Sequence, residues 1–131
     1  MTKRWRRWLL GLLLAAALFG GGYYALTCPL KFHSGLWQRH AGLRDRMLDN
    51  LLAEHLSAGM NRDQVHALLG EGGSPRQYSV LYQDRAHQIM EEYYYLRDSG
   101  PFCADFLILY YDLQGESYVC VTWDQKTVDL F

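Results

Sequence analysis

An apolar run near the amino terminus limits what this chain can be more than any other feature. No charged side chain occurs from Trp8 to Leu30. The basic residues that precede this run are Lys3, Arg4, Arg6 and Arg7. Twenty helical residues rise about 30 Å, the thickness of the hydrocarbon core of a bilayer. The sequence therefore predicts that residues 1–27 form an uncleaved signal anchor, a single transmembrane helix.

Two other interpretations of this segment stay open. The first is a cleaved signal peptide, although Tyr24, Leu26 and Thr27 offer no site of the small-x-small type. The second is a lipoprotein signal that ends at Cys28, although Thr27 stands where Gly, Ala or Ser is usual. In that case the protein is an outer-membrane lipoprotein attached through Cys28.

The charges are divided unequally around the apolar run. All 14 acidic residues follow it, so that residues 28–131 carry nine basic and 14 acidic groups, a net charge of −5. By the positive-inside rule, we expect the amino terminus in the cytoplasm and residues 28–131 outside it. If the host is bacterial, the anchor lies in the bacterial inner membrane and the domain in the periplasm. The acidic surplus argues against binding of nucleic acid, since phosphates are neutralised by Lys and Arg.

The rest of the chain divides into a juxtamembrane linker, residues 28–40, and one domain, residues 41–131. Apolar residues at helical spacing predict a first helix over 41–57, which Gly59 ends in a left-handed cap. Asn61 and Gln64 have the spacing of a capping box, which predicts a second, short helix that ends at Gly70.

Beyond residue 88 the apolar pattern has a period of two, which is typical of strands. It predicts antiparallel strands over 90–96, 104–111 and 118–123, with a hairpin turn at residues 113–116. Tyr78, Val80 and Tyr82 also alternate and are compatible with one further short strand. The predicted fold class is α+β, with two short helices packed on a three-stranded antiparallel sheet.

Residues 59–70, GMNRDQVHALLG, resemble the entry motif of SmpA/OmlA-type domains. Residues 93–96 and 107–115 are similar to the aromatic strands and the glycine-containing hairpin of that family. The resemblance implies two short helices on a three-stranded sheet, similar to the repeats of β-lactamase inhibitor protein. Family members include the small accessory lipoprotein of the outer-membrane barrel-assembly machinery, and they act by binding proteins.

Eight tyrosines lie between residues 78 and 118, an unusual number for a domain of this size. In a sheet with one face covered by helices, alternate tyrosines must lie on the open face, and rigid rings suit protein binding. The sequence therefore predicts a protein-binding face that contains Tyr93, Tyr95 and Tyr111.

Cys103 and Cys120 are candidates for a disulfide bond if the compartment is oxidising. The expected hairpin separates them by roughly 20 Å, whereas bridged Cα atoms lie within about 7 Å. A bridge therefore requires the loop of Cys103 to fold back over the sheet.

The sequence favours binding over catalysis. The five histidines, at 33, 40, 55, 66 and 87, have no spacing typical of a metal site. Glu91 and Glu92 are adjacent in a strand and point to opposite faces, so they cannot act as paired carboxylates. We expect no enzyme activity, metal, cofactor or small-molecule substrate. The predicted function is a membrane-anchored periplasmic interaction module, accessory to envelope or outer-membrane protein assembly; the alternative is an inhibitor or regulator of an envelope enzyme.

Overall fold

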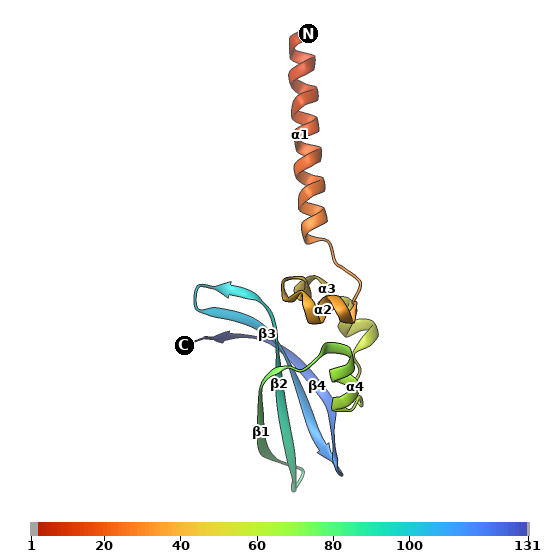
Figure 1. Ribbon diagram of the computed structural model, residues 1–131. Coiled ribbons are helices and arrows are strands. Elements are labelled where there is room, and N and C mark those ends of the chain that lie inside the picture. Colours follow the sequence, from red (N-terminus) through yellow and green to blue (C-terminus); the bar gives the residue numbers. More distant parts are fainter. Residues whose placement is uncertain (1–2, 131) are drawn as a thin grey trace.

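The computed structural model describes residues 3–130, apart from the side chains of Leu26, Thr27 and Ser74 (Figure 1). Helix α1 (Lys3–Thr27) stands away from a domain in which helices pack on an antiparallel sheet. Its segment Lys3–Ala25 is long and apolar enough to cross a membrane, and its side chains make no part of the domain core. An apolar amino-terminal helix, which is compatible with an anchor or a signal sequence, is therefore present.

The helix predicted over 41–57 consists of three helical segments in succession. They are η1 (Ala41–Leu43), α3 (Arg44–Asn50) and the π-helical η2 (Leu51–His55). Its apolar stripe is buried, as the periodicity indicates, with Met47 and Leu51 fully enclosed. The helix ends earlier than expected, because Leu56 is already extended, and Gly59 (φ 98°) forms the following turn.

Helix α4 (Arg62–Leu69) begins with the predicted capping box. The Asn61 side chain accepts from the Gln64 amide at 2.8 Å, and the Gln64 side chain accepts from the Asn61 amide at 3.0 Å. Two backbone donors that no helical carbonyl reaches are thereby satisfied. Val65 and Leu69 place the apolar side of α4 in the core.

Residues 28–40 are part of the folded domain rather than a free linker. They contain helix α2 (Ser34–Arg39), and Trp37 in this helix is fully buried. Arg44 lies over the Trp37 ring at 5.3 Å and donates to the Trp37 carbonyl at 2.8 Å. A tryptophan buries more apolar area than almost any other side chain, so it draws the segment onto the core.

The sheet has four strands in the order β1-β2-β3-β4, not the three that were expected. They are β1 (Gly73–Tyr82), β2 (Arg85–Gly100), β3 (Cys103–Gln114) and β4 (Ser117–Asp129). β1 lies at an edge and buries no described side chain, so it lacks the strong apolar alternation of a half-buried strand. Its turn to β2 has positive φ at Gln83 and Asp84, as in a type I′ hairpin.

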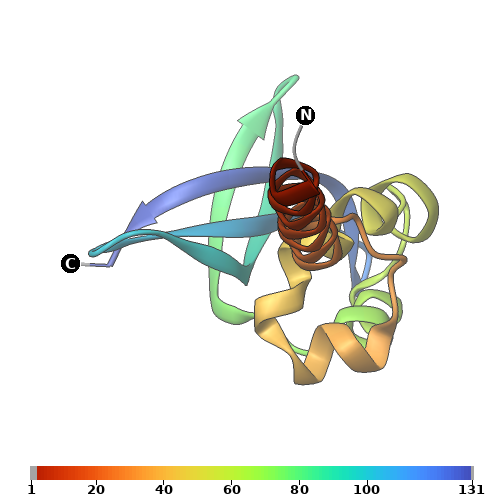
Figure 2. The ribbon, with the colours of Figure 1, turned by 90° about the horizontal axis from the view of Figure 1, so that it is seen from above.

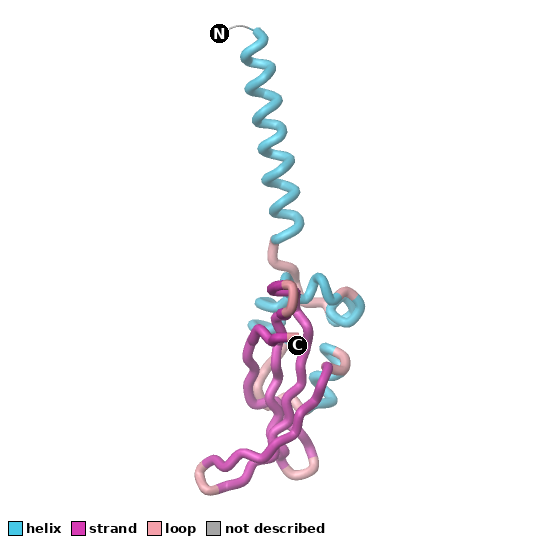
Figure 3. Tube along the Cα trace, turned by 90° about the vertical axis from the view of Figure 1, so that its left-hand side faces the viewer, coloured by secondary structure: helices cyan, strands magenta, loops and turns pink. Residues whose placement is uncertain are grey.

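The helices of the domain lie along one side of the sheet (Figure 2). They enclose a core to which the sheet contributes side chains from β2, β3 and β4: Met90, Tyr94, Leu96, Leu107, Leu109, Tyr111 and Cys120. The tube view shows the sheet as a second layer beside the short helices, with α1 continuing away from both (Figure 3). We call the opposite face of the sheet the open face.

Candidate functional site

The alternation of side chains along β2 decides which tyrosines reach the open face. Tyr94 and Leu96 are buried against the helices, whereas Tyr93 and Tyr95 between and beside them are half-buried on the other face. The structure therefore places two of the three tyrosines of the predicted binding face on the open face.

Tyr93 and Tyr95 form an aromatic cluster with Phe106 of β3. Phe106 pairs with Tyr95 in the register of the sheet, and its ring meets both tyrosine rings edge to face. Both centroid distances are 6.0 Å, with interplanar angles of 80° and 79°. Such contacts are within the favourable range for aromatic pairs, and they hold the rings in fixed orientations at the surface.

Glu91 connects the tyrosines of neighbouring strands on the same face. The Tyr78 hydroxyl donates to Glu91 Oε1 and the Tyr93 hydroxyl donates to Glu91 Oε2, each at 2.9 Å. Burial, together with the hydrogen bond to Glu91, raises the pKa of Tyr78 to about 12, and the same two causes raise the pKa of Tyr93. Both phenols therefore remain neutral donors at physiological pH.

A groove of about 340 Å³ crosses this face beside the aromatic cluster. Tyr93 and Phe106 form part of its lining, together with Val128 and Leu130 at the carboxyl end of the chain. Arg76 and Asp129 add one positive and one negative group to it. The groove thus offers an apolar surface with one group of each charge.

Tyr111 does not belong to this face, and its placement there was wrong. It is fully buried in the helix-side core, on the same face of β3 as Leu107 and Leu109. Both faces of β3 carry apolar residues, so alternation groups Tyr111 with Leu109 but does not say which face the helices cover. The register settles this, because Tyr111 pairs with Met90 of the core.

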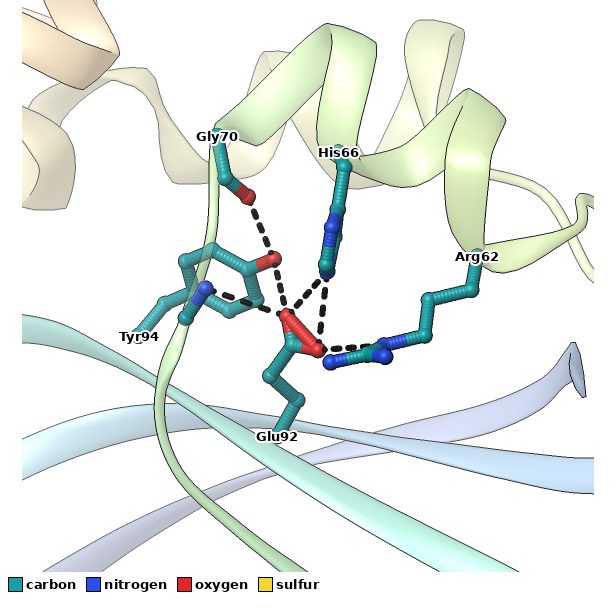
Figure 4. A network of polar contacts seen from close by, with 6 residues as sticks. Arg62, His66, Gly70, Glu92 and Tyr94 are labelled. Carbon is teal, nitrogen blue, oxygen red and sulfur yellow. Dashed lines mark hydrogen bonds and ion pairs between the residues drawn. The ribbon is translucent and has the colours of Figure 1, made fainter.

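A second cluster lies under α4, around the buried carboxylate of Glu92 (Figure 4). Glu92 has no exposed surface. Its Oε1 accepts from Arg62 Nε at 3.0 Å, and its Oε2 accepts from the Tyr94 hydroxyl at 2.8 Å and the Gly72 amide at 3.0 Å. His66 Nε2 lies 2.6 Å from Oε2.

The contacts of Glu92 determine its charge state. Burial by itself raises the pKa of this carboxyl, but hydrogen bonds from Tyr94, Gly72, Arg62 and His66 outweigh it, so that the pKa is lowered. The Glu92 carboxylate is therefore ionised at neutral pH. Since it is enclosed, it joins α4 and the loop before β1 to the sheet, and the cluster is a structural support for the open face.

Gly72 is the residue that lets this loop approach the carboxylate. A Cβ atom built at Gly72 would lie 2.4 Å from Glu92 Cγ and 3.0 Å from the Tyr93 carbonyl oxygen. The first approach is shorter than real Cβ atoms show and the second is tighter than most Cβ contacts, so the site favours a residue without a side chain.

The Glu92 cluster was not predicted from the sequence, although one pattern pointed to part of it. Arg62 and His66 are four residues apart on α4 and therefore share one face of that helix. Adjacent Glu91 and Glu92 were correctly expected to point to opposite faces. What was missing was the register that brings Glu92, 26 residues from His66, beneath the helix.

Cys103 and Cys120 are free thiols in this structure and lie far apart along the sheet. Cys103 pairs with Asp129 and donates to its carboxylate at 3.1 Å, whereas Cys120 pairs with Tyr111, eight residues further along β3. Burial raises the pKa of the Cys120 thiol to about 11. The candidate bridge between them is not formed.

The histidines serve separate elements. His33 accepts from the Leu36 amide at the start of α2, and His87 lies 3.2 Å from Asp112 on the open face. Among residues 3–130, no three His, Cys, Asp or Glu side chains gather in a way that could hold a metal ion.

Comparison with protein-family models, with curated proteins and with solved structures finds no match to this chain. The fold itself defines the class: an α+β domain with a four-stranded antiparallel sheet, helices on one face, and an apolar helix at the amino terminus.

Proposed function

We propose that this chain is a membrane-anchored interaction module that binds another envelope protein through the open face of its sheet. In this proposal α1 crosses the inner membrane with its amino terminus in the cytoplasm, and the domain lies in the periplasm. The resemblance of residues 59–70 to SmpA/OmlA-type domains supports a role accessory to envelope or outer-membrane protein assembly.

The observation that carries the proposal is the aromatic cluster of Tyr93, Tyr95 and Phe106 beside the groove. Their rings are partly exposed but already fixed by edge-to-face contacts, so that little conformational entropy is lost when a partner covers them. The Glu92 cluster holds the opposite side of the same strand rigidly, which preserves this geometry.

Crosslinking in intact cells, followed by purification of the full chain from membranes, tests the open face. We expect Tyr95→Ala combined with Phe106→Ala to reduce the yield of the specific crosslinked partner at least about tenfold, as expected for loss of an aromatic hot spot. Val121→Ala is the matched control, since Val121 is 40% exposed outside the cluster. An unchanged yield from a folded double variant would contradict the proposed surface.

The location is tested separately from the surface. A reporter that is active only outside the cytoplasm, fused after Phe131, is expected to be active. Labelling with a fatty-acid analogue, with Cys28→Ser as the control, distinguishes the anchor from the alternative of an outer-membrane lipoprotein attached through Cys28. Labelling that depends on Cys28 would show that the protein is a lipoprotein attached through Cys28 and would contradict the uncleaved anchor.

The second candidate is an inhibitor or regulator of an envelope enzyme, and the hairpin between β2 and β3 favours it. Phe102 at this turn is 62% exposed, and the turn lies at one end of the sheet, away from α4 (Figure 1). If the captured partner is an enzyme, addition of the purified chain is expected to lower its turnover, and Phe102→Ala is expected to relieve the effect.

A further inference from the structure

Strand β1 is the least covered element of the domain. Every described side chain from Pro75 to Ala86 is exposed, including Tyr82 at 63% and Leu81 at 74%. β1 pairs with β2 on one side only and is the first strand in the order of the sheet. A ten-residue strand that adds nothing to the core presents both its faces and one backbone edge.

The register shows which backbone groups form that edge. Tyr82 pairs with Arg85 across a two-residue turn, and such a flanking pair exchanges both of its hydrogen bonds. Alternation from Tyr82 then directs the N–H and C=O groups of Gln77, Ser79 and Leu81 away from β2. These residues offer three donors and three acceptors to an added strand.

The two edges of the sheet differ in how they are protected. β4 carries Asp124, Lys126 and Asp129, and at Cys120 its outer edge is already paired with Gly59 and Met60. Charged side chains and covering segments are the usual means of preventing unwanted strand addition. In β1, Pro75, Arg76 and a bulge lie near its start, but residues 77–82 contain neither charge nor proline, so this stretch of the edge lacks such protection.

We propose that β1 accepts an extended segment of another polypeptide, which adds antiparallel as a fifth strand of the sheet. The inference rests on the proposed function and specifies how the partner is held. Main-chain hydrogen bonds supply much of the affinity in this mode of binding, and alternate side chains supply the specificity.

The charge and side chains of β1 define the partner segment. Tyr78, Val80 and Tyr82 face the side of the groove and call for apolar residues at alternate positions opposite them. Arg76 is exposed, lines the groove, and has no ion pair among the described residues. An acidic group at the carboxyl end of an antiparallel segment lies opposite Arg76.

The test uses the full chain in detergent micelles and a synthetic peptide, acetyl-Val-Thr-Val-Thr-Val-Thr-Glu-amide, at about 1 mM, near the weak end of measurable affinities. Amide hydrogen exchange is followed residue by residue with NMR. We expect exchange at Gln77, Ser79 and Leu81 to slow at least about threefold, whereas Tyr78 and Val80, which already bond to β2, do not change.

Two variants sharpen the test. Ser79→Pro removes an outward N–H group without touching the ladder to β2 and is expected to abolish the protection, whereas Ser79→Thr retains it. Arg76→Glu is expected to weaken binding of the Glu-ended peptide and to favour a matched peptide that ends in Lys.

No protection in the folded chain, or protection that survives Ser79→Pro, would overturn the strand-addition proposal. Equal protection at neighbouring residues would do the same, since it indicates general covering rather than edge pairing. If the protection instead requires a second labelled copy of the chain, β1 pairs with another copy of itself, and the proposed partner segment is wrong. The open-face variants Tyr95→Ala and Phe106→Ala leave the β1 edge intact, so failure of one proposal is distinguishable from failure of the other.

Discussion

At the scale of single residues, Glu92 has the most demanding environment in the domain. A carboxylate without exposed surface is tolerated only where its oxygens are satisfied, and four groups approach this one. The alternation along β2 placed Glu91 and Glu92 on opposite faces from sequence alone. Which face is covered depends on packing between segments far apart in the chain, and so neither the cluster nor the burial of Tyr111 was predicted.

The lowered pKa of Glu92 makes stability depend on pH. Because the folded pKa lies below the ordinary value of 4.5, Glu92 contributes fully above that value, and its contribution is lost as the pH falls through the folded pKa. We expect Glu92→Gln to lower the free energy of unfolding by about 2–3 kcal/mol at pH 7. In urea unfolding followed by tryptophan fluorescence, the difference in unfolding free energy between Glu92→Gln and wild type should disappear below pH 4.5. A difference that does not change with pH would contradict this.

Two neighbouring glycines provide a matched test of the same cluster. Gly72→Ala places a methyl group 2.4 Å from Glu92 Cγ, so we expect a loss of about 2 kcal/mol or more in unfolding free energy. At Gly73 the nearest atom to an added Cβ is 3.8 Å away, and Gly73→Ala is expected to cost less than about 0.5 kcal/mol. Similar losses from both variants would show that the contact with Glu92 is not the cause.

At the scale of elements, periodicity predicted the interior better than the edges. The capping box of α4, the helical stripe after residue 41 and the strands on either side of Gly115 are local patterns, and the structure confirms them. β1 was only a suggestion from Tyr78, Val80 and Tyr82, because an exposed edge strand has no buried face to mark it. Helix α2 lies in residues 28–40, for which the sequence predicts a linker, since six helical residues are too few to show a period.

Trp37 tests whether α2 belongs to the domain. Its side chain is fully buried, so Trp37→Ala is expected to lower the free energy of unfolding by about 3–5 kcal/mol. Leu36 on the same helix is 38% exposed, and Leu36→Ala is expected to cost less than about 1 kcal/mol. Urea unfolding of both variants, followed by far-ultraviolet circular dichroism, makes the comparison. If both variants lose equally little free energy of unfolding, residues 28–40 are a linker and not part of the domain.

At the scale of the whole molecule, Arg46 joins the apolar helix to the domain. Its guanidinium donates to the Ala25 carbonyl at 2.8 Å and to the Cys28 carbonyl at 3.0 Å, and its own carbonyl accepts from the Leu30 amide. A cation at these terminal carbonyls also matches the negative end of the helix dipole. The orientation of the domain relative to α1 is thus held by specific bonds.

Removal of this junction should loosen the orientation without unfolding either part. With spin labels on α1 and on β3, we expect Arg46→Gln to broaden the measured distance distribution, because the guanidinium bonds to Ala25 in α1 and to Cys28 just after it are lost. Arg39→Gln is the control, since Arg39 is exposed on α2. An unchanged distribution in Arg46→Gln would show that the remaining contacts fix the junction alone.

The short segment between α1 and α2 limits how far the domain can move from the end of α1. Only residues 28–33 separate the two helices. Fully extended, these six residues would span about 20 Å, and the hydrogen bonds of Arg46 keep the segment from extending that far. If α1 is anchored in a bilayer, the domain cannot reach across the envelope and stays in the layer just above the lipid. A binding partner must therefore reach that layer, either through a membrane segment of its own or by transfer from another protein within a few nanometres of the surface.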